Sequence, residues 1–102
     1  MENKVLRKLF LGFINIHILH HAKEEPIYGA WILEELHEHG YDISSGTLYP
    51  ILHHMEKDKL LEKEDVNVKG KIRKYYRTTE LGDRVLDEAR IKAYELFKEI
   101  KL

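Results

Sequence analysis

Apolar residues recur at helical spacing from about residue 3 to residue 22, and they lie on nearly every side of the helix they predict. The apolar set comprises Val5, Leu6, Leu9, Phe10, Leu11, Phe13, Ile14, Ile16, Ile18 and Leu19. A helix that is apolar all round is buried on several sides. A chain of 102 residues cannot easily cover such a helix alone, so we expect part of it to meet a second subunit. Pro26 ends the segment, because proline breaks a helix and is tolerated at the start of the next one.

A second helix is predicted over residues 27–39, where one stripe of the helix is apolar. The stripe that faces the core consists of Gly29, Ile32, Leu33 and Leu36. Trp31 points away from this stripe, on the same side as the glutamates, so we expect it to cover a neighbouring element or a partner chain. A platform for a ligand is the alternative interpretation of this tryptophan. Gly40 is suited to end the helix, because glycine adopts left-handed backbone angles without steric cost.

A third helix follows after only about four residues and begins between Ser44 and Thr47. Serine at a helix start supplies a capping oxygen, and the first amides of a helix can bind phosphate. Pro50 supports this start, because a residue without an amide proton fits only the first turn or a kink. The apolar side of this helix carries Ile51, Leu52 and Met55. Two helices this close in sequence predict a helix-turn-helix, whose second helix enters the major groove of DNA.

Two extended segments come next, at about residues 60–66 and 72–78, and a glycine-containing loop over residues 67–71 joins them into a hairpin. The run of residues 69–77 contains no acid and five basic side chains, Lys69, Lys71, Arg73, Lys74 and Arg77. The opposing segment carries Glu62, Glu64 and Asp65. A cross-strand charge ladder on a solvated hairpin explains the pairing of these charges. A charge ladder does not require a purely basic tip, whereas a wing that contacts DNA phosphates requires one. We therefore favour the interpretation of the hairpin as a DNA-contacting wing.

The last predicted helix runs from about residue 79 to residue 100, with Thr79 as its N-cap. Gly82 in its first turn is unfavourable for a helix and therefore indicates close packing. A coiled-coil-like seam repeats at intervals of three and four, through Leu86, Ala89, Ala93, Leu96 and Ile100. A helix of about 22 residues is roughly 33 Å long and extends beyond a domain of this size. We therefore divide the chain into a winged helix-turn-helix domain, residues 1–78, and a dimerisation helix, residues 79–102.

The composition limits the class of protein. The net charge is −1 although 34% of the residues are charged, so a nucleic-acid surface requires local segregation of charge. Cysteine is absent, which excludes disulfides and thiolate metal sites and agrees with a reducing cytoplasm. The longest uncharged run, residues 9–22, is too short to span a bilayer. We expect a soluble cytoplasmic protein that is mainly α-helical with a small β-hairpin and has no membrane contact.

Seven histidines raise the question of a metal site. His17, His20 and His21 share one arc of the first helix, and the spacing of His17 and His21 suits two ligands on one face. Neither a cysteine nor a nearby carboxylate on that arc completes the site, so we expect structural or surface histidines and neither metal nor cofactor. The sequence also lacks a phosphate-binding glycine loop and a nucleophile motif, so an enzyme is not expected.

Three motifs, in this order and spacing, resemble the PadR family of transcriptional regulators. They are Ile27-Tyr28-Gly29, Ser44-Ser45-Gly46-Thr47-Leu48-Tyr49-Pro50-Ile51-Leu52 and Gly70-Lys71-Ile72-Arg73-Lys74-Tyr75-Tyr76-Arg77-Thr78-Thr79-Glu80-Leu81-Gly82. The similarity covers about residues 10–85, and the single helix that follows resembles the short subfamily. Two departures, Ala30-Trp31 in place of a tyrosine–acid pair and His53-His54 where a basic residue is common, prevent transfer of a base preference.

The resemblance implies a sequence-specific homodimeric repressor that binds a palindromic operator in double-stranded DNA and releases it on binding an aromatic or drug-like effector. The implied DNA-binding residues are Tyr28, Ser44, Ser45, Thr47, Tyr49, His53, Lys69, Lys71 and Arg73. The expected dimer interface comprises Leu86, Ala89, Ala93, Leu96, Ile100, Phe10 and Phe13. We expect an effector pocket between the first and last helices of the dimer, lined by Phe10, Phe13, Trp31 and Phe97.

Two other classes of protein remain open. A winged-helix module could bind another protein through Trp31 and the glutamates and never contact DNA. A metal-responsive regulator could use His17, His20 and His21. Salt-sensitive binding to DNA separates the first alternative from a DNA-binding regulator, and a response to zinc identifies the second.

Overall fold

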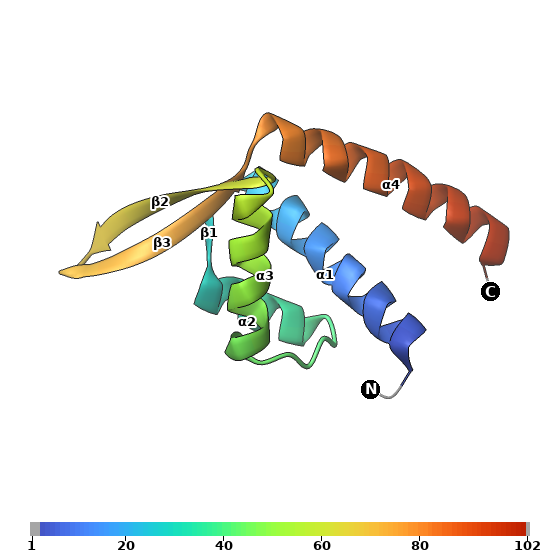
Figure 1. Ribbon diagram of the computed structural model, residues 1–102, viewed down its shortest axis with the longest axis horizontal. Coiled ribbons are helices and arrows are strands. Elements are labelled where there is room, and N and C mark those ends of the chain that lie inside the picture. Colours follow the sequence, from blue (N-terminus) through green and yellow to red (C-terminus); the bar gives the residue numbers. More distant parts are fainter. Residues whose placement is uncertain (1–2, 102) are drawn as a thin grey trace.

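The computed structural model describes residues 3–101 and has four helices and one small sheet (Figure 1). In chain order the elements are α1 (Lys4–Glu24), β1 (Ile27–Tyr28), α2 (Gly29–Glu38), α3 (Ser45–Lys57), β2 (Leu61–Val68), β3 (Lys71–Thr78) and α4 (Glu80–Ile100). The three strands are antiparallel in the order β1-β3-β2. The predicted fold is confirmed: a winged helix-turn-helix that is mainly helical, followed by a long C-terminal helix.

Strand β1 corrects the prediction that the second helix begins at Ile27. Pro26 favours an extended residue before it, and Glu25 has extended backbone angles. Ile27 lies opposite Tyr76 of β3 in the sheet and is buried. The backbone groups of this short segment therefore pair with the edge of β3 instead of forming a first helical turn, and α2 begins only at Gly29.

Gly40 ends the second helix as predicted. Its φ of +91° lies in the left-handed region, and the amide of Tyr41 donates to the carbonyl of Leu36 at 2.9 Å. The amide of Gly40 donates to the carbonyl of His37 at 3.0 Å, which completes the hydrogen-bond pattern of a Schellman motif. The ring of His37 also contacts the carbonyl of Ile43 at 2.7 Å. These contacts fix the turn that orients α3.

The third helix begins at Ser45, within the predicted interval, and Ser44 is its N-cap. The Ser44 hydroxyl accepts a hydrogen bond from the amide of Thr47 at 3.2 Å. Pro50 lies in the second turn, on the exposed side of α3. Because proline has no amide proton, the carbonyl of Gly46 loses its intrahelical partner and faces the surroundings of the helix.

The core lies where the helices meet the base of the sheet. Its buried members are Ile14, Ile18, Leu19, Ala22, Ile27, Ile32, Leu36, Leu48, Leu52, Met55, Leu61, Tyr76 and Leu86. Helix α1 contributes only its C-terminal half, while Val5, Leu6 and Leu9 near its start are exposed. One copy of the chain therefore does not cover the all-round apolar surface of α1.

The hairpin formed by β2 and β3 projects away from the helices (Figure 1). Val68 lies opposite Lys71, so only Lys69 and Gly70 form the loop, which is shorter than the predicted loop over residues 67–71. Both loop residues have positive φ, 53° and 85°, as a two-residue type I′ turn requires. Asn67 supports the turn, because its side-chain oxygen accepts from the amide of Gly70 at 2.9 Å.

Helix α4 begins at the predicted N-cap, Thr79, whose hydroxyl oxygen accepts from the amide of Gly82 at 3.0 Å. The same hydroxyl donates to the carbonyl of Lys59 at 2.5 Å. Gly82 packs so closely on the carbonyl oxygen of Leu60 that a Cβ atom would collide with it, which confirms the predicted close packing. Leu86 is the last buried residue of α4, and the C-terminal part of this helix extends beyond the other helices (Figure 1). None of the helices in residues 3–101 combines the length and apolar character needed to cross a membrane.

Candidate nucleic-acid interface

Helix α3 buries one side in the core and exposes the other side to solvent. Leu48, Leu52 and Met55 point into the core. On the outer side Ser45, Tyr49 and His53, one turn apart from each other, are all exposed. Three of the predicted DNA-contacting residues therefore share one accessible surface of the helix. Gly46 and Pro50 are exposed on the same side and were not among the predicted contacts.

Ser44 caps α3, as the sequence predicts, and Thr47 lies beside it. The Ser44 hydroxyl caps the helix and donates to the Thr47 hydroxyl at 3.4 Å. Thr47 is half-buried at the edge of the exposed surface. Both side chains thus stabilise the start of α3, while the amides of Ser45 and Gly46 are left at the helix N-terminus without intrahelical acceptors. Such amides are suited to hold a phosphate.

Gly29 determines where the Tyr49 ring lies. A Cβ atom at position 29 would overlap the phenol ring of Tyr49, so only glycine allows the ring to lie against the start of α2. Tyr49 nevertheless keeps 49% of its surface exposed. The Tyr28-Gly29 motif therefore places an accessible phenol between the start of α2 and the outer side of α3.

A groove of about 600 Å³ separates the helices from the wing. Its basic lining comes from Lys71, Arg73 and Lys74 on β3. Its aromatic lining comes from Tyr28, Tyr49 and Tyr76. The groove thus brings together predicted residues from β1, α3 and β3, which are far apart in sequence, and combines positive charge with phenol groups that can donate hydrogen bonds.

The basic residues of β3 point to two faces of the wing, because side chains alternate along a strand. The Arg73 guanidinium lies over the Tyr28 ring, 4.0 Å from its centroid. That ring also meets Tyr75 edge-on at 5.5 Å. Lys74 shares the opposite face with Tyr76, which is buried toward the helices. Lys74 was absent from the predicted contacts, and strand alternation is the signal that could have identified it.

The charge-ladder interpretation applies to the base of the wing. Arg77 and Glu62 form an ion pair at 2.8 Å, and both side chains are more than half exposed. Asp65 lies opposite Lys74 in the strand register. Among the ion pairs of residues 3–101, none involves Lys69 or Lys71 at the tip. The tip therefore presents positive charge that the wing itself does not neutralise.

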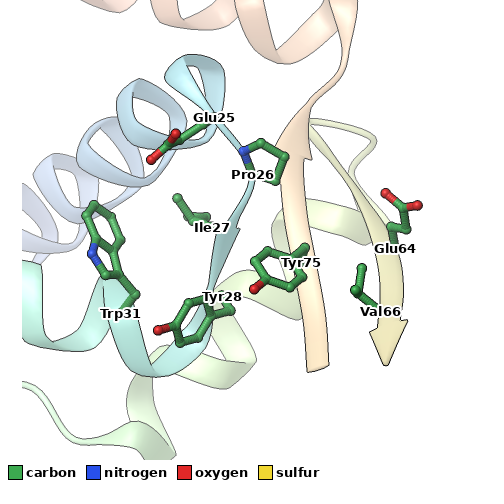
Figure 2. Close-up of a pocket in the computed structure, with 8 residues that line it drawn as sticks. All are labelled: Glu25, Pro26, Ile27, Tyr28, Trp31, Glu64, Val66 and Tyr75. Atoms are coloured by element: carbon green, nitrogen blue, oxygen red, sulfur yellow. The ribbon is translucent and has the colours of Figure 1, made fainter. Parts of the chain in front are cut away.

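Trp31 covers a neighbouring element, as predicted, because its indole meets the His21 ring of α1 edge-on at 5.3 Å. Its remaining surface lines a shallow cavity of about 460 Å³ beside the sheet. Figure 2 shows Trp31, Tyr28 and Tyr75 around this cavity, with Glu25 and Glu64 at its ends. The tryptophan is thus partly a packing residue and partly accessible to a ligand.

The predicted effector residues lie apart from one another in a single copy of the chain. Phe13 lines a cavity of about 560 Å³ between α1 and α4. Phe10 lines another one beside the turn before α3 and meets the Tyr41 ring at 6.3 Å. Phe97 is 62% exposed on α4. Trp31 lies at the sheet, so the predicted four-residue pocket is not formed by these residues in a single subunit.

The predicted dimer residues also separate into two groups. Leu86 is 1% exposed and belongs to the core of the subunit, so it is not available as an interface residue. Ala93, Leu96 and Ile100 are exposed, and Ala89 is partly covered. The seam predicted from the sequence is therefore accessible only after its first position.

A histidine cluster joins α1 to the end of α2. The rings of His17 and His39 lie 4.7 Å apart, and those of His17 and His21 are stacked at 6.3 Å. Glu35 contacts His21 and His39, because its Oε2 lies 3.5 Å from Nε2 of His21 and 3.1 Å from Nε2 of His39. The expectation that no carboxylate lies near these histidines on their own arc is wrong, because Glu24 lies close to His20 and His21 on α1. Two further possible ligands lie outside that arc. His39 and Glu35 come from another helix, and only packing brings them there.

Two members of this cluster favour the neutral form. Burial lowers the pKa of His17 below its ordinary value, and the neighbouring His39 and His21 lower it further. Burial also lowers the pKa of His21, although the Glu35 carboxylate opposes that shift. His20 is more exposed, on the outside of α1, and its Nε2 lies 3.8 Å from Oε1 of Glu24.

A capped helix-turn-helix, a basic hairpin beside the exposed side of its second helix and a long final helix define a winged helix-turn-helix protein. Residues 18–88 match the model of the "Transcriptional regulator PadR-like family". The chain belongs to this family of transcriptional regulators.

Relatives agree with this assignment over nearly the whole chain. Transcriptional regulator Rv3488 of Mycobacterium tuberculosis is 43% identical over 95 residues, 93% of this chain and 89% of the relative. A crystal structure of a PadR family transcriptional regulator from Eggerthella lenta has 36% identity and a TM-score of 0.80, covering 93% of this chain and 84% of that one. A PadR-like transcription factor from Bacteroides fragilis has 32% identity and a TM-score of 0.81, with 95% of both chains covered.

Proposed function

We propose that the chain is a sequence-specific DNA-binding regulator that acts as a homodimeric repressor on a palindromic operator. The observation that carries this proposal is the groove where the exposed side of α3 faces the basic strand of the wing. In this arrangement α3 enters the major groove and the wing contacts the flanking backbone. The two elements then supply different parts of the binding free energy.

Sequence preference comes from the exposed side of α3. Ser45 and His53 carry hydrogen-bonding groups there, and Tyr49 is held close to the backbone of α2 by its contact with Gly29. Base edges are read by such groups in the major groove. Lys69, Lys71 and Arg73 of the wing contribute affinity without preference, because phosphates are the same in every sequence.

Dimerisation is supported by the apolar surface that the subunit leaves uncovered. On α4, Leu96 is 51% and Ile100 is 64% exposed, and Phe10 and Phe13 on α1 are exposed as well. Exposed apolar patches of this kind mark interaction surfaces. A two-fold dimer through α4 and α1 brings two α3 helices to one side of the DNA, about one helical turn apart. Two-fold symmetry in the protein then requires a palindromic site.

Effector release belongs to the same proposal. The cavity lined by Phe13, His17 and Arg90 lies between the two helices that form the proposed dimer interface. A planar aromatic compound held there contacts α1 and α4 together and alters the separation of the two α3 helices. Release of a labelled operator by aromatic compounds, compared between the parent and Phe13→Ala, tests this step. Release that is identical in both chains contradicts the assignment of this cavity.

Binding to double-stranded DNA is tested by fluorescence anisotropy with labelled duplexes at several salt concentrations. The proposal predicts saturable binding that weakens steeply with salt. It also predicts that the protein reduces transcription from a promoter overlapping its site. Absence of salt-sensitive binding to any duplex contradicts it and favours the protein-interaction alternative, in which Trp31 and the glutamates of α2 form the contact surface.

A further inference from the structure

The histidine cluster provides nitrogen and oxygen ligands from two helices at one point. His17 and His21 are one turn apart on α1, so both side chains emerge on the same face. His39 is the C-cap residue of α2 and reaches them from the other side. One ligand nitrogen from each of the three histidines lies within 4.8 Å of the other two. A cation placed among them would be in reach of all three rings.

The distances can be compared with those of a tetrahedral zinc site. With bonds of about 2.0–2.1 Å, neighbouring ligand atoms lie about 3.3 to 3.4 Å apart. The two separations from Glu35 Oε2, 3.5 Å to His21 Nε2 and 3.1 Å to His39 Nε2, bracket this value. The histidine ligand atoms lie within 4.8 Å of one another, so side-chain rotation has to bring them to the same spacing. Glu35 thus offers a carboxylate oxygen beside two of the three imidazoles.

We propose that His17, His21, His39 and Glu35 bind one divalent transition-metal ion of the zinc class. A ligand set dominated by imidazole suits zinc, cobalt, nickel or copper, whereas calcium and magnesium take oxygen ligands. The metal ties the middle of α1 to the last turn of α2, just before the turn that orients α3. The inference is independent of DNA binding, because none of the four proposed ligands is among the residues that line the wing groove.

A competing set shares one ligand with this site. His20, His21 and Glu24 also lie close enough to hold an ion. His20 and Glu24 are more than half exposed and sit 3.8 Å apart on the outside of α1. The proposed set is better enclosed, since His17 is half-buried and the Glu35 side chain is 23% exposed. The two sets predict opposite results for variants of His20 and His39.

Trp31 gives the site a built-in optical probe. It is the only tryptophan of the chain, and its indole lies against His21. Cobalt at the site is paramagnetic and quenches a neighbouring indole, and its absorption spectrum distinguishes tetrahedral from octahedral coordination. Both signals report on the site without any reference to DNA.

The experiment uses the full chain without a polyhistidine tag. Zinc binding is measured by calorimetry, and cobalt binding by absorption and by Trp31 fluorescence. We expect one metal ion per chain, a tetrahedral cobalt spectrum and quenched fluorescence. His39→Ala should weaken binding by at least about 100-fold, and Glu35→Gln by about 10- to 100-fold. The matched control, His20→Ala, changes an adjacent exposed histidine of α1 and should leave the affinity unchanged.

Folding of each variant is checked by circular dichroism before titration. His39 is 48% exposed at a helix end, so its replacement should leave the fold intact. A parent chain that binds neither zinc nor cobalt overturns the proposal without the use of any variant. Loss of binding in His20→Ala with retention in His39→Ala assigns the metal to the outer set and overturns it as well. An octahedral cobalt spectrum contradicts the proposed ligand geometry.

Discussion

Removing the two basic side chains nearest the wing loop tests how the wing contributes to DNA binding. In the double variant Lys71→Ala, Arg73→Ala a dimer loses four positive charges. Each phosphate contact contributes about −0.9 to the slope of log K against log salt. Loss of four contacts therefore flattens the slope by about 3.6. Specific and non-specific duplexes should weaken by the same factor, because phosphates carry no sequence information.

The smallest change in salt slope that we predict depends on where the Arg73 side chain lies in the complex. Its guanidinium rests on the Tyr28 ring at 4.0 Å. If it stays there in the complex, only Lys71 contacts phosphate, and the slope changes by about 1.8 for the dimer. Anisotropy titrations of Lys71→Ala alone and of the double variant, over a series of salt concentrations, separate these two outcomes.

Arg77→Ala is the matched control for this experiment. Arg77 is on the same strand, but it is paired with Glu62 at the base of the wing. We therefore expect its replacement to leave the slope unchanged. A slope in the double variant equal to that of the parent would mean that the basic tip is a solvated surface, and the wing assignment would then be withdrawn.

Three further changes test the dimer, the Tyr49 contact and a helix end. Leu96→Asp places a charge on the exposed apolar side of α4 and should convert a sedimenting dimer into a monomer; a monomeric parent refutes the dimer. Gly29→Ala should displace the Tyr49 ring and weaken DNA binding, with a loss of stability of about 1 kcal/mol; unchanged affinity refutes the role of the ring. Lys59, just after the end of α3, has a φ of 66°, which is unfavourable for any residue except glycine. Lys59→Gly should therefore raise the free energy of unfolding by about 0.5–1 kcal/mol in denaturant titrations. A lower free energy of unfolding would contradict the claim that the backbone is strained at Lys59.

The helices could be predicted because their signals are local. The serine cap at Ser44, the glycine at Gly40 and the threonine cap at Thr79 each act within a few residues of their own position. The apolar periodicity of α2 and α3 likewise identifies the side that packs. These features require no knowledge of the tertiary structure, and the structure confirms them.

Features that depend on packing could not be predicted in the same way. The two-residue strand β1 exists because β3 offers Ile27 and Tyr28 a pairing edge. Leu86 fits the spacing of the seam on α4, yet this part of the helix packs against the core, and Leu86 is buried there. His39 follows α2 in the sequence and gives no sign that it meets His17. Periodicity determines a face of a helix but does not identify the neighbour of that face.

The proposed DNA-binding function is tested most directly by selecting bound duplexes from a random pool with the full chain. The structure pairs one α3 with one wing in each subunit, and the exposed side of α4 supplies the proposed two-fold contact. We predict enrichment of an inverted repeat whose half-sites are about one helical turn apart. A pool that shows no enrichment, or that yields a single half-site without its inverted copy, would contradict the account.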